Sequence, residues 1–296
     1  MTFSLDKRVM DLGREYPEWK PWLTVIAEVL REATDPKWEA FVPGLPAPCQ
    51  SKVPLLAGAT LAVDMTIVAR WWERLRRAAY QSGTPKMSTL KLAKHPRVDV
   101  ATLFTSSLCQ NREWLKETAL HRGVDSDAFQ AVAVLMPVPF LQACSRRWAQ
   151  STVESWTEGY CPVCGAWPAL TEVRGIERRR YLRCGRCGTE WQAHCLSCPF
   201  CAMTDHRELV SLVPEKSGST RTVDACKCCF GYVKSFTVLQ GAPAAGVMLD
   251  DLASVDLDVA ALAQGYKRPE GTGYCLEVTI VNDPSRWSRS APWRAS

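Results

Sequence analysis

The sequence has 296 residues, more than one compact core usually takes, so we expect two or three domains. With 47% hydrophobic and 23% charged residues, its composition is that of a globular protein, which excludes a wholly disordered or fibrous chain. The formal net charge of +5 is mild for this length.

The first 150 residues have helical periodicity, and their apolar residues recur three or four positions apart. Pro137 and Pro139 should kink or split the last helix. We expect the tryptophans of this half to fill a helical core rather than line a binding groove. The predicted helices cover Pro21–Leu30, Ala57–Tyr80, Val98–Leu120 and Asp127–Gln150, and an extended linker covers Ala47–Pro54.

Neither a secretory signal nor a membrane helix is visible in the sequence. A membrane helix needs about 18 uncharged apolar residues, and the best candidates, Val53–Ala69 and Ala131–Leu141, are interrupted by Asp64 and by prolines. We therefore expect a soluble, cytoplasmic protein without membrane insertion.

The fourteen cysteines are unevenly distributed, and ten of them lie between Cys161 and Cys229. In the cytosol thiols stay reduced, so clustered cysteines indicate metal or redox chemistry rather than a disulfide scaffold. The other four fit no ligand spacing and should be buried as small hydrophobic residues: Cys49, Cys109, Cys144 and Cys275.

Four Cys-x-x-Cys pairs, here called knuckles, occur in this segment. Two residues between cysteines let a tight turn direct both sulfurs at one point, and two knuckles complete a tetrahedron. Gaps of nineteen and twenty-four residues separate the paired knuckles, the first matching the usual tetrathiolate spacing and the second slightly longer. The sequence predicts a first cluster of Cys161, Cys164, Cys184 and Cys187 and a second cluster of Cys198, Cys201, Cys226 and Cys229.

Further candidate ligands lie near these knuckles. Cys195 forms its own Cys-x-x-Cys pair with Cys198, and Cys228 lies inside the last knuckle; each is an alternative ligand or a free thiol. We expect His194 and His206 not to be ligands, because eight thiols suffice.

The residue after a knuckle is expected to need a positive φ angle. Gly165 and Gly188 meet this need after the first two knuckles. The other two knuckles depart from the pattern, with Ala202 after one and Phe230-Gly231 after the other.

Tetrahedral thiolate sites suit Zn(II) or a mononuclear iron. The spacings do not resemble those of iron–sulfur clusters. Whether the ions are structural or redox-active stays open.

Short β-like runs accompany the cysteines at Arg180–Arg183, Leu209–Val213 and Tyr232–Leu239. Beyond them, Asp250–Ala253 should cap a helix that runs through Ala263 and closes at Gly265. The tail after Lys267 is expected to fray.

Several of these motifs together resemble the formate dehydrogenase accessory protein FdhE family. They extend from about Tyr160 to Tyr266, and Cys195, Cys228 and the tail after Lys267 depart from the family pattern. The motifs are Tyr160–Gly165, Arg180–Cys187, Thr189–Trp191, the pair Cys198 and Cys201, Cys226–Cys229 with Tyr232–Lys234, and Asp250–Ser254.

The resemblance implies an α+β multidomain protein with a helical N-terminal domain, two rubredoxin-like (zinc-ribbon-like) tetracysteine modules and a short C-terminal helix. The corresponding ranges are 1–155, 156–192, 193–240 and 241–296. The resemblance also implies two cofactors, which are metal ions each bound by four thiolates from the eight cysteines, and it favours iron over zinc. It would be an accessory protein that binds the catalytic subunit of a respiratory formate dehydrogenase in the cytoplasm, before twin-arginine export. A homodimer stays open.

Two other functions are considered. A nucleic-acid-binding zinc ribbon is disfavoured, because Ser155–Ser235 has 11 Lys and Arg against 8 Asp and Glu, and two divalent tetrathiolate sites would make its net charge negative. A rubredoxin-like electron-transfer or thiol redox protein would use the metals or a spare thiol. No catalytic residues are predicted, and we expect no enzymatic turnover.

Overall fold

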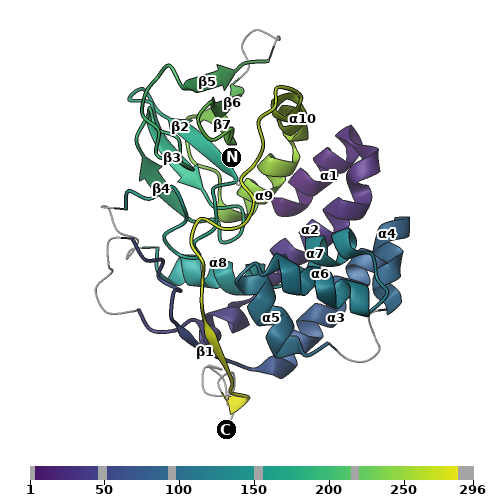
Figure 1. Ribbon diagram of the computed structural model, residues 1–296. Coiled ribbons are helices and arrows are strands. Elements are labelled where there is room, and N and C mark those ends of the chain that lie inside the picture. The colour runs from purple at the N-terminus through teal and green to yellow at the C-terminus, as the bar shows by residue number, and fades with distance from the viewer. Residues whose placement is uncertain (1–3, 46–51, 93–97, 150–155, 215–219, 286–296) are drawn as a thin grey trace. The chain divides into compact units, whose positions relative to one another are not determined.

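The computed structural model describes residues 4–45, 52–92, 98–149, 156–214 and 220–285 (Figure 1). The chain divides into two compact units. The first unit comprises residues 1–45, 56–147 and 277–296, and the second comprises residues 46–55 and 148–276. Most of the predicted linker, together with Cys49, lies outside the described residues.

The first unit is helical apart from one short parallel strand pair. Strand β1 (Thr60–Val63) pairs with β8 (Thr279–Asn282). The α-helices are α1 (Leu5–Glu15), α2 (Lys20–Glu32), α3 (Met65–Gln81), α4 (Pro85–Ser88), α5 (Val100–Leu108), α6 (Arg112–His121), α7 (Ser126–Ala133) and α8 (Val138–Arg147), and the 3-10 turns are Pro17–Trp19, Pro36–Phe41 and Thr89–Leu92.

The predicted helix at Ala57–Tyr80 is wrong over its first turns. Residues Thr60–Val63 form β1, and α3 starts only at Met65 because the Asp64 side chain accepts a hydrogen bond from the Thr66 N–H, 2.8 Å away, and caps the helix there. The strand is stabilised by β8, more than 200 residues further along the chain, and the local sequence carries no sign of that partner.

The two later predicted helices are each divided. A left-handed residue, Gln110 (φ 55°), and the N-cap Asn111 separate α5 from α6. The expected proline effect is confirmed, since α7 ends before Pro137 and Pro139 lies in the first turn of α8.

The apolar side chains of the first unit form a buried core. Trp38, Trp71 and Trp72 are at most 3% exposed, in agreement with the core interpretation, whereas Trp19, Trp22 and Trp114 are only half-buried. By length and composition alone the stretch Ser126–Arg147 could cross a membrane, but 78% of its most apolar window is buried inside the protein. It is therefore a core helical segment of a soluble protein.

The second unit contains a six-stranded sheet in the order β4-β3-β2-β7-β6-β5, which Figure 1 shows beside α9 and α10. Every neighbouring pair is antiparallel except β2 and β7, which run parallel. The strands are β2 (Leu170–Arg174), β3 (Arg179–Arg183), β4 (Glu190–Ala193), β5 (Leu209–Leu212), β6 (Arg221–Cys226) and β7 (Tyr232–Val238).

The sheet is built from two similar halves. In each half a knuckle precedes three successive strands, and a second knuckle lies between the second and third of them. The halves join where β2 of the first pairs with β7 of the second, with Leu170 opposite Lys234. The two cysteine modules therefore share one sheet, and the predicted division at residues 156, 193 and 241 stays a prediction.

Helices α9 (Ala244–Leu252) and α10 (Val255–Ala263) pack on this sheet. The buried Lys234 of β7 lies 2.7 Å from Asp251 of α9 and 2.9 Å from Asp258 of α10, and Arg268 pairs with the same two carboxylates. This ion network connects the helices to the sheet.

The C-terminal expectations need correction. Asp250 and Asp251 lie inside α9 and do not cap a later helix; α10 begins after Ser254, and Gly265 (φ 83°) follows it as expected. Two parts of the tail after Lys267 have fixed partners instead of fraying: Arg268 is ion-paired, and Thr279–Asn282 form β8. Residues 286–296 lie outside the described part.

Candidate metal centres

The first two knuckles are tight turns of one geometry. The N–H of Gly165 donates to the carbonyl of Cys161 at 2.9 Å, and the N–H of Gly188 donates to that of Cys184 at 3.0 Å. The first cysteine of each turn donates in return to the carbonyl five residues on, at 2.9 Å in both cases. These local bonds hold both sulfurs of each knuckle on one side of the turn.

The predicted need for glycine after these two knuckles is confirmed. Gly165 has φ 67° and Gly188 has φ 76°. A Cβ atom at Gly188 would lie 2.2 Å from the Cβ atom of Ala244, so close packing excludes a side chain there as well.

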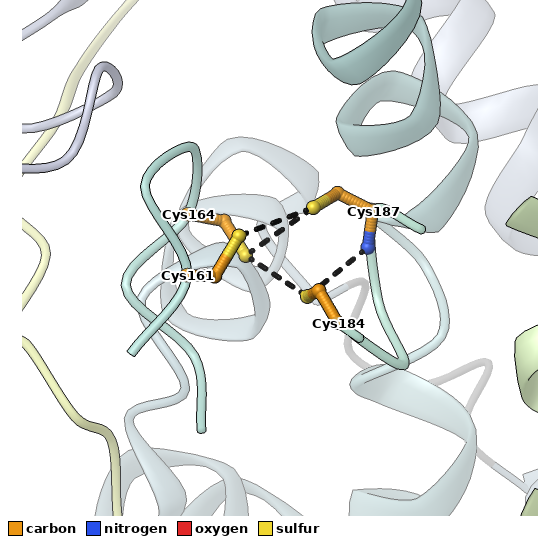
Figure 2. Close-up of side chains that lie close together, drawn as sticks. All are labelled: Cys161, Cys164, Cys184 and Cys187. Carbon is orange, nitrogen blue, oxygen red and sulfur yellow. Dashed lines mark hydrogen bonds between the residues drawn. The ribbon is translucent and has the colours of Figure 1, made fainter. Parts of the chain in front are cut away.

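The four sulfurs of the first cluster face one another (Figure 2). Sγ–Sγ distances are 3.4 Å for Cys161–Cys187, 3.6 Å for Cys164–Cys184 and 3.9 Å for Cys164–Cys187. Four sulfurs at about 2.3 Å from a tetrahedral metal are about 3.8 Å apart, whereas a disulfide needs about 2.05 Å. The spacing therefore fits a tetrathiolate metal site and not a disulfide.

Backbone N–H groups and one hydroxyl surround these sulfurs. The N–H of Val163 lies 3.4 Å from Cys161 Sγ, and that of Arg186 lies 3.4 Å from Cys184 Sγ. The thiol of Cys187 donates a hydrogen bond to the hydroxyl oxygen of buried Thr189, with Sγ and Oγ1 3.0 Å apart. Ligand spacing alone missed Thr189, although it belongs to the Thr189–Trp191 motif. Backbone N–H contacts of this kind stabilise thiolates and would tune the properties of a metal held there.

Burial sets the electrostatics of the first cluster, whose four cysteines are at most 1% exposed. Burial, followed by the neighbouring thiols, raises the pKa of Cys161. Burial likewise raises the pKa of Cys187. Four thiolates without a cation would repel one another in a medium of low dielectric constant. The donor set therefore suits a bound divalent or trivalent cation.

The second cluster repeats this geometry. Its Sγ–Sγ distances are 3.6 Å for Cys198–Cys229 and 3.7 Å for Cys201–Cys226. In the positions equivalent to Gly165 and Gly188, Ala202 has φ 58° and Phe230 has φ 57°. The departure seen in the sequence therefore leaves the turn unchanged but places two side chains in a strained backbone conformation.

Exposure distinguishes the second cluster from the first. Cys198 and Cys226 are buried, Cys229 is half-buried and Cys201 is exposed. Burial raises the pKa of Cys229 to about 11. Cys201 is less buried than Cys229. Its burial acts to raise the pKa of its thiol, but hydrogen bonds from the Met203 N–H and with the neighbouring thiols hold that pKa below its usual value.

The other candidate ligands lie outside both clusters. Cys195 is exposed, and its sulfur lies 3.7 Å from the Arg178 carbonyl. Cys228 is exposed beside Cys201, whose charge raises the pKa of the Cys228 thiol. His194 and His206 are exposed side chains that belong to neither group of four sulfurs.

The expectation that the outlying cysteines are buried is correct only in part. Cys144 is buried and Cys109 is partly buried, but Cys275 is exposed, since it lies in the extended segment between α10 and β8.

Two cavities adjoin the knuckle of Cys198 and Cys201. One of about 180 Å³ is lined by Cys195, Cys198 and Cys226, among others. The other, of about 670 Å³, contains Cys201 and several aromatic side chains, among them Trp156, Tyr160, Trp167 and Phe200. The second cluster is thus accessible to small molecules from its surroundings.

The basic run Arg178-Arg179-Arg180 is not a continuous surface patch. Arg180 is 5% exposed and lies 3.3 Å from Asp224 and 2.7 Å from the carbonyl of Ser197, and Arg179 pairs with Glu177. These partners take up the charges that a phosphate backbone would need.

Residues 160–194 match a protein-family model described as "FdhE, central domain". This range contains the whole first cluster and the first three strands of the sheet.

Curated relatives carry the same family name. A "Protein FdhE homolog" from Aquifex aeolicus is 26% identical over 70% of this chain and 70% of its own length. One from Pseudomonas aeruginosa is 32% identical over 44% of this chain and 47% of its own length. "Protein FdhE" of Escherichia coli O127:H6 is 32% identical over 37% of this chain and 35% of its own length. The matched stretches thus span less than half of the last two relatives.

One solved structure resembles the whole fold. The crystal structure of the FdhE protein from Pseudomonas aeruginosa has a TM-score of 0.57 and 21% sequence identity, covering 93% of this chain and 98% of that one. At this identity the likeness shows the fold.

Proposed function

Because the chain belongs to the FdhE family, we propose that it is an accessory protein for the maturation of a respiratory formate dehydrogenase. It binds the catalytic subunit of that enzyme in the cytoplasm, before export by the twin-arginine route. The observation that carries the proposal is the match of residues 160–194, with a complete tetracysteine cluster, to the FdhE central domain.

Two metal ions complete the second unit. The first would be held by Cys161, Cys164, Cys184 and Cys187, and the second by Cys198, Cys201, Cys226 and Cys229. The family resemblance favours iron over zinc, and the all-sulfur donor set accepts either. A bound iron would supply one-electron chemistry, whereas zinc would stabilise the fold.

The role of the protein is binding rather than catalysis. Each half of the sheet has a cluster at one end, and ligation holds the two knuckles of each half together. The metals thereby stabilise the surface that the second unit offers to its partner. No turnover is assigned to the chain.

Rubredoxin-like electron transfer or thiol redox chemistry is the second candidate function. The exposure of Cys201 favours it, because an electron or a small oxidant could reach this cluster from solvent. Nucleic-acid binding has less support, since the basic run is engaged in internal contacts.

Co-purification tests the proposal. A tagged chain is captured anaerobically from cells that also produce the formate dehydrogenase catalytic subunit. We expect that subunit in the eluate, and more weakly with Cys184→Ser, which removes a buried ligand. Cys195→Ser, which leaves both clusters intact, serves as the matched control and should retain the subunit. Absence of the subunit from every eluate, with both proteins present in the lysate, would refute the proposed function.

A further inference from the structure

The larger cavity beside the second cluster has an aromatic wall of four side chains, Trp156, Tyr160, Trp167 and Phe200. Neighbouring rings of this wall pack edge to face, with centroids 5.6 Å apart for Trp156–Tyr160, 6.2 Å for Tyr160–Trp167 and 5.4 Å for Trp167–Phe200. Tyr160, Trp167 and Phe200 are half-buried, so part of each ring stays open to the cavity.

Close packing and a hydrogen bond hold the aromatic wall in place. The Tyr160 hydroxyl donates to the carbonyl of Lys52 at 2.8 Å. A Cβ atom at Gly273 would lie 2.3 Å from the Cβ atom of Tyr160, and one at Gly231 would lie 2.6 Å from the Phe200 ring. The rings therefore lie against backbone that has no room for a side chain, and the wall is preformed.

The lining of this cavity is apolar and negatively charged. Its described residues include no lysine or arginine, but they include the half-buried Glu158. The Glu158 carboxylate lies 3.4 Å from the ammonium group of Lys52, whose side chain is 73% exposed, and such an exposed pair is weak. Cys201 also lines the cavity, and four thiolates outweigh the charge of any divalent or trivalent ion that they hold.

Other aromatic rings of the second unit have cationic neighbours. An arginine guanidinium lies 4.3 Å from the ring centroid of Tyr181, 5.0 Å from that of Phe236 and 5.7 Å from that of Tyr232. Within the described residues, no cation lies over a ring of the aromatic wall. The cavity thus offers aromatic surface beside a carboxylate, which is the environment that a basic side chain prefers, without containing that side chain.

We propose that this cavity binds an extended segment of the formate dehydrogenase catalytic subunit in which a lysine or arginine is flanked by apolar residues. The basic side chain lies against the aromatic wall and pairs with Glu158, and its apolar neighbours contact the open parts of the rings. A volume of about 670 Å³ is that of a small-ligand site, so it takes a few residues of the partner rather than a folded element. The identity of the partner rests on the function proposed above, whereas the chemistry of the segment rests on the cavity.

The first test maps the segment. Overlapping peptides that cover the catalytic subunit are immobilised and probed with the purified full chain. We expect binding to peptides in which a basic residue lies between apolar residues, and loss of binding when that basic residue is replaced by glutamate.

The second test measures the contribution of the cavity residues. A peptide that binds is labelled, and its dissociation constant is determined by fluorescence anisotropy. Glu158→Gln should weaken binding roughly fivefold, Glu158→Lys more than about tenfold, and Trp167→Leu roughly fivefold, with the metal content of each variant measured as a check on folding. The matched control is Glu177→Gln, which removes an exposed, ion-paired carboxylate outside the cavity and should leave binding unchanged.

Three results would overturn the inference: no binding to any peptide, equal binding of peptides with and without a basic residue, or equal affinity of Glu158→Lys and the unaltered chain. Co-purification distinguishes this inference from the proposed function. Equal capture of the catalytic subunit by Glu158→Lys and by the unaltered chain would count against the inference alone. Failure of the unaltered chain to capture the subunit, with both proteins present, would count against the proposed function as well.

Discussion

The two cysteine clusters share one backbone geometry but differ in their shielding. All four knuckles place a residue with positive φ directly after their second cysteine, and the sulfurs that contact one another in both clusters are 3.4 to 3.9 Å apart. Yet every sulfur of the first cluster is buried, whereas Cys201 of the second is exposed. The spacing of the cysteines thus determines which metal ions a cluster can bind, and the packing around the cluster determines how well its sulfurs are shielded from solvent.

The positive-φ positions differ in the same sense. The first cluster uses glycine at both positions, and the second uses Ala202 and Phe230. A residue with a Cβ atom in the left-handed region costs about 1–2 kcal/mol. The second half of the sheet therefore contains both the more open cluster and the more strained turns.

The largest difference is expected on removal of one ligand from each cluster. Cys184→Ser should abolish binding of the first metal and protection of β2–β4 from amide hydrogen exchange, because ligation supplies about 10–16 kcal/mol in zinc-finger peptides. Cys201→Ser should lose the second metal while β2–β4 stay protected. Equal loss of protection in both variants would remove the distinction between the clusters.

Metal removal by a chelator should proceed in two phases. The second metal should leave roughly tenfold faster than the first, since the buried cluster must first open by local unfolding. Metal release is followed by absorbance, and Cys201→Ser, which lacks the fast-releasing site, should show the slow phase alone. Release of both metal ions in a single phase would contradict the difference in shielding between the two clusters.

Close packing around the first cluster predicts a moderate effect at Gly188. We expect Gly188→Ala to lower the free energy of unfolding by about 2 kcal/mol, from the backbone cost and the contact with Ala244. Gly175→Ala is the matched control, with φ 65° and open space around its Cβ, so it bears only the backbone cost. Denaturant unfolding measures both, and a Gly188→Ala loss no larger than that of the control would be inconsistent with the packing argument.

The smallest effect concerns the strained turn of the second cluster. Ala202→Gly should raise the free energy of unfolding by about 0.5 kcal/mol, because relief of the backbone strain exceeds the added entropy of the unfolded chain. Ala166 is buried but does not have a positive φ, so the control substitution Ala166→Gly should lower the free energy of unfolding instead. A gain in the free energy of unfolding for Ala202→Gly and a loss for Ala166→Gly would support the difference between the turns. A loss for Ala202→Gly would contradict it.

The parts that the sequence predicted correctly depend on local spacing. The two clusters follow from the positions of eight cysteines, and α2 follows from apolar periodicity. Both signals are complete within a short stretch of chain.

The parts that were missed depend on distant partners. Strand β1 pairs with β8, and β2 lies between β3 and the distant β7, so neither strand is marked by its own four or five residues alone. The unequal exposure of the clusters likewise arises from packing around each knuckle, as between Gly188 and Ala244. The sequence predicts a helix cap at Asp250–Ala253, but the Asp251 carboxylate pairs with the buried Lys234.

The central claim, two tetrathiolate metal centres in one chain, is tested most directly by metal analysis of the anaerobically purified protein, combined with X-ray absorption at the metal edge. We predict two metal ions per chain, each with four sulfur ligands at about 2.3 Å, and for iron a sulfur-to-iron charge-transfer absorption. Fewer than two ions per chain, or oxygen and nitrogen in the ligand shell, would contradict the account.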